Sequence, residues 1–309
     1  MSFSGKMQNS HYYSVFFAPR GRDRIYDLGM QISQMYLSPY DKLIGIIGEA
    51  GSGKSMIIKG MFPGLELTND DNGVNARPLP ILDQGDCGFF SAHTYHLDIR
   101  FEAAFTQLHE LADAILNAVR NGKRVIVEHF DMIYPFIKTN ADLLIGVGEE
   151  IIINRPTIFG PLPGEIKRIV GKSIIYRRMA HTAEDLCEIF MPKEFLEDCR
   201  HGDIKHGFVL EFSKRPDFDI DKLEADVLDA IKKDIGVSYV DEAHIRIGDI
   251  LHHCTGPRTH MSSTGKVENF RLIKEVFYDS LKGKYMLAGR VGPHYKVEQA
   301  NDFNDLGSE

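Results

Sequence analysis

The sequence has few cysteines, and they are widely separated. Four occur among its 309 residues: Cys87, Cys187, Cys199 and Cys254. So few thiols in a chain of this size exclude the disulfide framework that stabilises small secreted domains. We therefore expect reduced cysteines, and Cys254 alone lies among other residues able to bind a metal ion.

Long apolar runs and a leader-like N-terminus are also missing. No run of about 18 apolar residues occurs. The first residues lack a charged segment followed by an apolar one. The sequence thus predicts neither a membrane span nor a signal peptide, and we expect a cytoplasmic protein without a membrane partner.

An excess of basic residues is lacking as well. The formal net charge is −8, and neither half of the chain has more basic than acidic residues. Long-range electrostatic attraction of nucleic acid is therefore not expected, and a nucleic-acid partner would need a local basic patch. The hydrophobic content of 43% and the chain length suffice for two domains. Oligomeric state is not indicated.

One octapeptide, at residues 48–55, identifies a ligand class. It reads G-E-A-G-S-G-K-S and follows the apolar run Leu43–Ile47, which predicts a strand, a phosphate-binding loop (Walker A) and a helix. Gly48, Gly51, Ser52 and Gly53 would let backbone N–H groups surround a polyphosphate. Lys54 would reach the β- and γ-phosphates, and the Ser55 hydroxyl would bind Mg²⁺. We expect ATP or GTP with Mg²⁺.

Acidic residues that could complete this site follow along the chain. Residues 64–68 read as a short strand, and Asp71 after it is either a catalytic or substrate-binding acid or part of an Asn/Asp/Gly turn. Residues 101–120 have helical spacing, and residues 123–127 form a buried strand that ends in acids. Glu128 is the first candidate for the acidic Mg²⁺ contact, and Asp131 is the alternative. Residues 91–100 either bring His96, Asp98 or Arg100 near a substrate or form a half-buried strand.

In this order of motifs, the first half resembles the P-loop nucleoside and small-molecule kinases, uridine kinases in particular. Alternating strands and helices predict a three-layer α/β domain over residues 1–170 with a mostly parallel sheet. From about residue 140 the pattern loosens into a Pro/Gly-rich stretch that indicates a loop or domain connection.

The second half contains a different set of reactive side chains. His181 and Asp185 are four residues apart in a helical pattern and so share a helix face. Cys254 and His260 lie in the later segment 252–260. Imidazole, carboxylate and thiolate form a donor set for Zn²⁺. Without a metal, His181 and His260 would position a water against an ester carbonyl, or all these residues would be ordinary packing and loop residues.

These stretches resemble the editing domain, called the second additional domain, of threonyl- and alanyl-tRNA synthetases. Matching segments are residues 181–186, 254–257, 259–265 and 270–274, with a strand pair at 202–212 and a helix at 221–235 between them. The resemblance implies an α+β domain over residues 171–300, followed by a polar tail at 301–309. Asp185 stands where the family has a second histidine. Arg258 takes the position of the later histidine unless two residues are inserted before His260.

The resemblance implies hydrolysis of the ester between a wrong amino acid and tRNA. The leading hypothesis is an ATP-binding P-loop enzyme joined to an editing-like domain, with Lys54, Glu128, Asp71, His181 and His260 as catalytic residues. A complete aminoacyl-tRNA synthetase is excluded by length. One alternative is a kinase whose second domain recognises a nucleoside-like or amino-acid-like substrate. Another is a nucleotide-gated sensor of aminoacyl-tRNA or an amino acid that has no enzymatic turnover.

Overall fold

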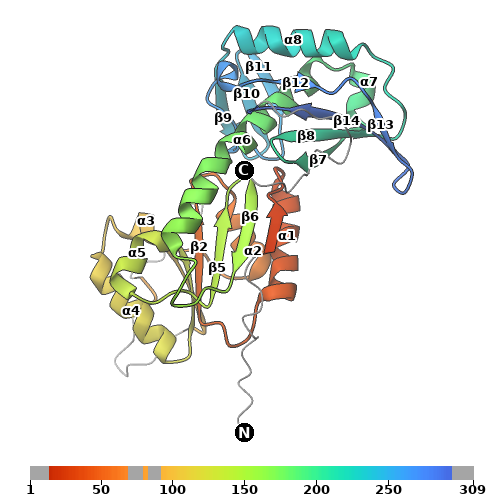
Figure 1. Cartoon of the computed structure of the whole chain (residues 1–309). Helices are drawn as coiled ribbons and strands as arrows, with labels where there is room; N and C mark the ends of the chain where they lie inside the picture. The colour runs from red at the N-terminus through yellow and green to blue at the C-terminus, as the bar shows by residue number, and fades with distance from the viewer. Residues whose placement is uncertain (1–13, 69–78, 83–91, 294–309) are drawn as a thin grey trace. The chain divides into compact units, whose positions relative to one another are not determined.

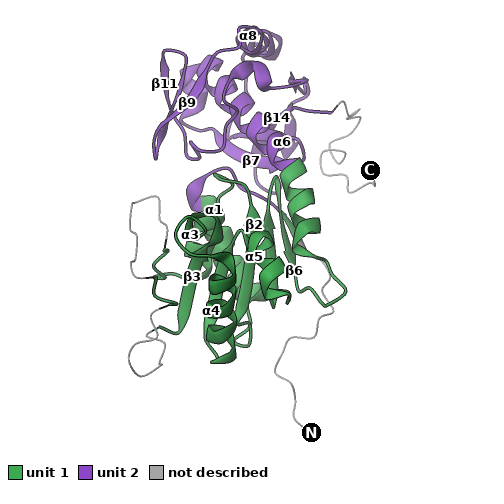
Figure 2. Ribbon diagram, turned by 90° about the vertical axis from the view of Figure 1, so that its left-hand side faces the viewer, with its two compact units in different colours: residues 1–16, 24–172 green, residues 17–23, 173–309 purple. Residues whose placement is uncertain are grey.

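A computed structural model describes residues 14–68, 79–82 and 92–293 of the chain (Figure 1). Its contacts divide the chain into two compact units, which Figure 2 colours separately: residues 1–16 with 24–172, and residues 17–23 with 173–309. The division at 172/173 falls within helix α6 (Pro163–Phe190). The expected polar tail and Asp71 lie outside the described residues.

The first unit is built on a six-stranded sheet with the order β1-β6-β5-β2-β4-β3. Strands β2, β4 and β3 are parallel neighbours, β5 is parallel to β2, and β6 is antiparallel to β5. This confirms the expected α/β class with a mostly parallel sheet. The strands are β1 (Ser14–Phe17), β2 (Leu43–Gly48), β3 (Thr94–Asp98), β4 (Arg124–Glu128), β5 (Leu143–Val147) and β6 (Glu150–Asn154).

Helices cover both faces of this sheet. Helices α3, α4 and α5 lie on one face, and α1 and α2 lie on the other (Figures 1 and 2). The central strand β2 is buried along most of its length, as a strand covered on both faces must be. The helices are α1 (Arg22–Tyr36), α2 (Lys54–Met61), α3 (Ile99–Glu102), α4 (Leu108–Arg120) and α5 (Phe130–Ile137).

Three local expectations in the first half were wrong. The Pro/Gly-rich loop is present at residues 155–162, but the stretch between residue 140 and this loop contains strands β5 and β6, because short apolar segments joined by a tight turn pair with each other. The single helix expected at 101–120 is two helices, α3 and α4, and Phe105 between them is 64% exposed instead of buried. Residues 64–68 form no strand. Thr68 instead donates its backbone N–H to the His96 ring.

The second unit contains two antiparallel sheets. One has the order β12-β14-β8-β7 with β13 paired to β14, and the other has the order β11-β10-β9. The expected strand pair and helix are present as β7, β8 and α8. The elements are α7 (Lys193–Leu196), β7 (Arg200–Ile204), β8 (Gly207–Phe212), α8 (Ile220–Lys232), β9 (Val237–Asp241), β10 (His244–Ile247), β11 (Ile250–His253), η1 (Thr264–Lys266), β12 (Arg271–Leu272), β13 (Phe277–Asp279) and β14 (Lys284–Arg290).

The C-terminal half of α6 runs through the core of this unit. Every residue from 179 to 187 is buried. Apolar members such as Ala183 and Leu186 pack with Phe208 and Leu210 of β8 in one cluster. Polar members, among them His181, Glu184 and Asp185, are buried as well. Buried polar side chains must find polar partners, so this helix brings a set of reactive groups into the interior.

Residues 17–23 belong to the second unit, which differs from the expected domain of residues 1–170. The cause is Arg20, which is buried: its Nε and Nη2 donate to the two Glu184 oxygens at 3.0 and 2.9 Å. Its Nη1 lies 3.0 Å from Asp203 Oδ1. Burial alone would raise the pKa of Glu184, but Arg20 and His201 outweigh it and lower that pKa to about 2. A buried ion pair formed across 164 positions leaves no pattern in the local sequence.

Among the described helices, none combines the length and apolar character that crossing a membrane requires.

Candidate functional sites

The segment 48–55 connects the end of β2 to the start of α2, as the sequence predicted. Gly53 precedes α2 with φ 95° and ψ 13°, a conformation open to glycine and strained for other residues. A Cβ on Gly48 would lie 2.8 Å from the Val147 backbone oxygen. The loop therefore depends on two of its glycines for conformation and close packing. It lies at the carboxyl end of a central parallel strand, where open α/β sheets bind ligands.

Glu128, at the end of β4, is the acid that meets this loop. Ser55 Oγ donates to Glu128 Oε1 at 3.2 Å, and Lys54 Nζ lies 3.5 Å from Glu128 Oε2. Lys54 Nζ also donates to the Glu49 backbone oxygen at 3.0 Å. Burial alone would raise the pKa of Glu128, but the His96 hydrogen bond and the Lys54 charge lower it to about 2. The structure thus brings the two predicted phosphate and Mg²⁺ side chains to an ionised carboxylate.

His96 holds that carboxylate from the neighbouring strand β3. Its Nδ1 accepts the Thr68 backbone N–H at 3.2 Å, and its Nε2 lies 3.2 Å from Glu128 Oε1. Because Nδ1 accepts, the proton of the neutral ring is on Nε2, which donates to Glu128. Residue 96 combines the two sequence readings: it lies in a strand, although β3 is buried on both faces rather than half-buried, and its side chain also contacts Glu128.

A second acid at this strand edge is Asp98. Asp98 and Glu128 are register partners at the ends of β3 and β4, and with His129 they form a group whose donor atoms all lie within 4.8 Å of one another. Asp131, the alternative candidate, instead forms an ion pair with Lys167 Nζ at 2.6 Å. Asp98 rather than Asp131 is therefore the carboxylate that lies beside Glu128, because the parallel register of β3 and β4 aligns their ends.

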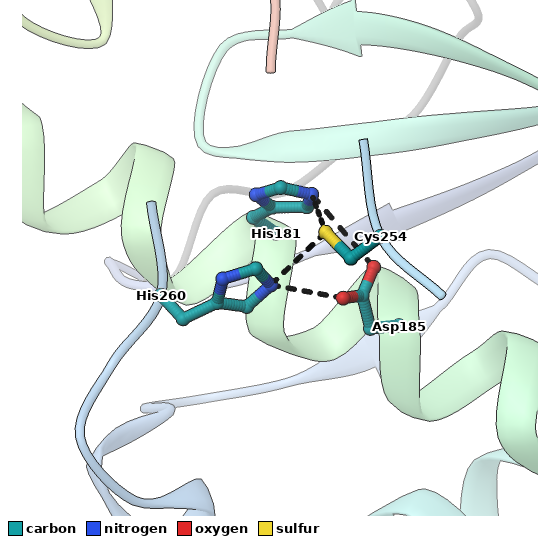
Figure 3. A group of neighbouring side chains, drawn as sticks. All are labelled: His181, Asp185, Cys254 and His260. Carbon is teal, nitrogen blue, oxygen red and sulfur yellow. Dashed lines mark hydrogen bonds and ion pairs between the residues drawn. The ribbon is translucent and has the colours of Figure 1, made fainter. Parts of the chain in front are cut away.

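In the second unit, the four predicted metal ligands come together (Figure 3). One donor atom from each of His181, Asp185, Cys254 and His260 lies within 4.8 Å of the other three. Cys254 Sγ is 3.4 Å from His181 Nε2 and 3.8 Å from His260 Nε2. Asp185 is 3.7 Å from His181 Nε2 and 2.9 Å from His260 Nε2. Tetrahedral Zn²⁺ bonds of usual length separate nitrogen and sulfur ligands by about 3.6 Å, so the spacing fits a cation.

Backbone contacts orient the ligands inward. His181 Nδ1 lies 3.2 Å from the Thr259 carbonyl oxygen, and His260 Nδ1 lies 3.2 Å from that of Pro257. With a cation in the centre, each Nδ1 would donate there and each Nε2 would present a lone pair, as in metal-binding histidines. Without a cation, His260 Nε2 lies close enough to Asp185 Oδ2, at 2.9 Å, to donate to it. The Gly256 N–H donates to Cys254 Sγ at 3.3 Å, which favours a thiolate.

The pKa shifts of His181 and Cys254 also bear on cation binding in this group. Burial, followed by the charges of His260 and Arg20, lowers the pKa of His181 well below its usual value. A neutral imidazole is the form that binds metals. Burial and the Asp185 charge raise the pKa of the Cys254 thiol, and a bound divalent cation would reverse this by stabilising the thiolate.

The structure also distinguishes residues 258 and 260. His260 belongs to the four-residue group, and its ring stacks on that of His181 with centroids 4.1 Å apart. Arg258 lies outside the group, 4.6 Å above the Tyr239 ring and 3.3 Å from Glu242. His260 rather than Arg258 is therefore the candidate ligand of this loop.

Sequence reasoning missed several residues next to this centre. His201 lies between Glu184 and Glu188 at 3.2 and 3.1 Å, and these carboxylates, with Glu184 first, raise its pKa to about 9 although burial lowers it. His252, expected in a loop, is on β11 and lies 3.3 Å from Glu188. The glutamates were detectable: they continue the spacing of His181 and Asp185 along one helix face.

Comparison of the chain with protein-family models and with curated proteins gives no match. Among solved structures, the ornithine aminotransferase from Toxoplasma gondii ME49 aligns with 82% of this chain and 70% of its own, at 10% sequence identity and a TM-score of 0.23. Similarity this low supports no inference about fold or activity.

Proposed function

We propose that the chain is a P-loop enzyme that binds a Mg²⁺–nucleoside triphosphate, ATP or GTP, in its first unit and holds Zn²⁺ in its second. The second unit would hydrolyse an ester between an amino acid and tRNA. The observation that carries the first part is the convergence of Lys54 and Ser55 on the ionised Glu128 carboxylate. The second part is supported by the inward-facing donors of His181, Asp185, Cys254 and His260 and by the sequence resemblance to synthetase editing domains.

At the nucleotide site, each side chain has one expected task. Lys54 Nζ would exchange its contacts with Glu128 and the Glu49 carbonyl for the β- and γ-phosphate oxygens. Ser55 Oγ would bind Mg²⁺, and Glu128 would hold a water of its shell. Asp98 lies at the same strand edge and would add a further carboxylate.

In the second unit, the metal would polarise the ester carbonyl. Asp185 would then act as general base, accepting the proton of a water whose oxygen attacks the carbonyl carbon. The bond between that carbon and the tRNA hydroxyl oxygen would then break, and the protonated Asp185 would pass the proton on to the departing oxygen, so that a free amino acid and a tRNA hydroxyl result. Asp185 fits this role because each carboxylate oxygen has two lone pairs, so an oxygen that would hold a cation could still accept the proton of the water.

The nucleotide proposal is tested by Lys54→Ala in equilibrium binding of labelled ATP and GTP with Mg²⁺. The matched control is Lys59→Ala, on the same helix but outside the loop. We expect at least a hundredfold loss of affinity for Lys54→Ala and little change for the control. Affinity unchanged by Lys54→Ala would overturn the proposal.

The ester proposal is tested with a panel of mischarged tRNAs, with and without Mg–ATP, following both ester loss and phosphate release. We expect the wild-type chain to deacylate at least one of them and Cys254→Ser to lose both zinc and activity. Zinc retention by Cys254→Ser, or no ester loss from any tRNA of the panel, would contradict this part and leave the nucleotide result standing.

One observation favours a second candidate, a small-molecule kinase. Asp98, Glu128 and His129 gather beside the phosphate loop, and an acid in that place could take the proton of an acceptor hydroxyl during phosphoryl transfer. A metabolite screen for phosphate transfer decides this point. Phosphorylation of a nucleoside-like or amino-acid-like compound, lost in Asp98→Asn, is the supporting result, and ATP turnover indifferent to every compound counts against it.

A further inference from the structure

A second set of metal-binding side chains lies next to the four-ligand centre and shares one member with it. Asp185 and Glu188 are three positions apart on α6, and His252 projects from β11. Their donor atoms all lie within 4.8 Å of one another. His252 Nε2 is 3.3 Å from Glu188 Oε2 and 3.9 Å from Asp185 Oδ2.

The ring nitrogen of His252 points to a missing ligand. His252 Nε2 is inaccessible to solvent and makes no hydrogen bond within the described part of the chain, although the Glu188 oxygen is close. A buried polar atom without a hydrogen bond is destabilising. Two donors on one cation, with bonds of about 2.1 Å at the tetrahedral angle, lie about 3.4 Å apart. The 3.3 Å between His252 Nε2 and Glu188 Oε2 therefore fits two ligands of one cation. In the absence of a cation, burial alone would lower the pKa of His252, but the same pair can form an ion pair that raises it.

Asp185 can serve both sets at once. Its Oδ1 lies 3.7 Å from His181 Nε2, and its Oδ2 lies 2.9 Å from His260 Nε2 and 3.9 Å from His252 Nε2. A carboxylate in this position bridges the two cations of dinuclear sites, which are roughly 3.5–4 Å apart. Glu188 is held in place from its other side, where its Oε1 lies 3.1 Å from His201 Nε2.

We propose that Asp185, Glu188 and His252 form a second divalent-cation site, so that the second unit binds two cations bridged by Asp185. The new site has two oxygen donors and one nitrogen donor and no sulfur, a set that suits Zn²⁺ or Mn²⁺. With three protein ligands it keeps a coordination position for a water or a substrate oxygen, whereas the first centre has four. The second cation is thus the more exchangeable one, and its site does not depend on whether the unit hydrolyses an ester.

Cobalt titration of the chelator-treated chain tests the site, because a Cys254 thiolate gives Co²⁺ a sulfur charge-transfer absorption that a sulfur-free site lacks. We expect two Co²⁺ per wild-type chain, the first with charge transfer and the second with ligand-field bands only. Glu188→Gln and His252→Gln should bind one Co²⁺ and keep the charge transfer. His253→Gln, the adjacent histidine on the same strand, should still bind two.

The two centres can fail separately in this experiment. If the first centre binds a cation, Cys254→Ser removes the charge-transfer absorption. If this variant still binds the second Co²⁺, the two sites are shown to be separate. A wild-type stoichiometry of one with charge transfer overturns the second site, even if a variant fails to fold. Two Co²⁺ bound by folded Glu188→Gln, with folding checked by circular dichroism, overturns it as well.

Discussion

Glu128→Gln measures the effect of the negative charge at the centre of the proposed nucleotide site. The amide keeps the shape of the side chain and an acceptor for His96, but it removes the negative charge 3.5 Å from Lys54 Nζ. The pKa of Glu128 is lowered from 4.5 to about 2 in the folded chain. At roughly 1.4 kcal/mol per pKa unit, this difference corresponds to about 3 kcal/mol of stability at neutral pH.

The sign of the pH dependence follows from the lowered pKa of Glu128. The stabilisation is complete above the unfolded pKa of 4.5 and is lost as the pH falls from there toward 2. We expect Glu128→Gln to be less stable than wild type by about 3 kcal/mol at pH 7, and by about 2 kcal/mol at pH 3.5. Glu66→Gln, an exposed glutamate of the same unit, should change stability by less than about 0.5 kcal/mol.

Because the chain has two units, the assay must resolve them. Urea unfolding read by pulsed hydrogen exchange and mass spectrometry gives the transition of peptides from residues 24–172 separately from that of the second unit. A stability difference below about 0.5 kcal/mol at pH 7, or one that grows as the pH is lowered, would refute the reasoning that Glu128 is ionised and stabilised by its neighbours.

Three further predictions concern single side chains. Carboxylates raise the pKa of His201 to about 9. The contribution of the charged His201 to the stability of the fold is therefore complete below pH 6.5 and is lost as the pH rises toward 9. Over this range the melting temperature should fall in wild type and in His253→Gln, and it should fall less in His201→Gln. Arg20→Met leaves the buried Glu184 with His201 as its remaining cationic partner and should destabilise the second unit by about 3–5 kcal/mol in urea unfolding. Arg22→Met removes an exposed pair with Glu242 and should cost under about 1 kcal/mol; equal effects would contradict the assignment. Gly53→Ala should lose about 1–2 kcal/mol of stability because of the positive φ. It should lose more because the new Cβ would lie 2.4 Å from the Ile25 side chain. Gly64→Ala has a similar φ and open space around it, so it should show only the loss caused by φ; equal losses of stability in the two variants would rule out the steric contribution.

The strand, turn and helix around residues 48–55 were predictable because these residues are contiguous and their conformation is local. Gly48 to Ser55 occupy the strand, turn and helix start that the pattern requires. Glu128 was predictable because parallel strands place their carboxyl ends at one edge of a sheet. The choice between Asp98 and Asp131 as its neighbour was not, since it depends on the register of β3 and β4 and on the distant partner Lys167.

The group of candidate metal ligands was predictable in its members but not in its arrangement. Residue types and helical spacing suggested His181 and Asp185, whereas contacts over 73 and 75 positions bring Cys254 and His260 to them. Two further features left no local pattern. Arg20 joins residues 17–23 to the second unit through Glu184, and His252 reaches Glu188 from β11.

The sequence by itself determined what depends on neighbours along the chain: the loop at 48–55, the alternation of strands and helices in the first half, and the identity of the candidate ligands. Only the tertiary structure decided which of those ligands meet, that His260 rather than Arg258 belongs to the centre, and that Asp185 lies between two groups of donors. The physical reason is that hydrogen bonds and metal distances act over about 3–4 Å in space, and for residues far apart in the chain only packing fixes that separation.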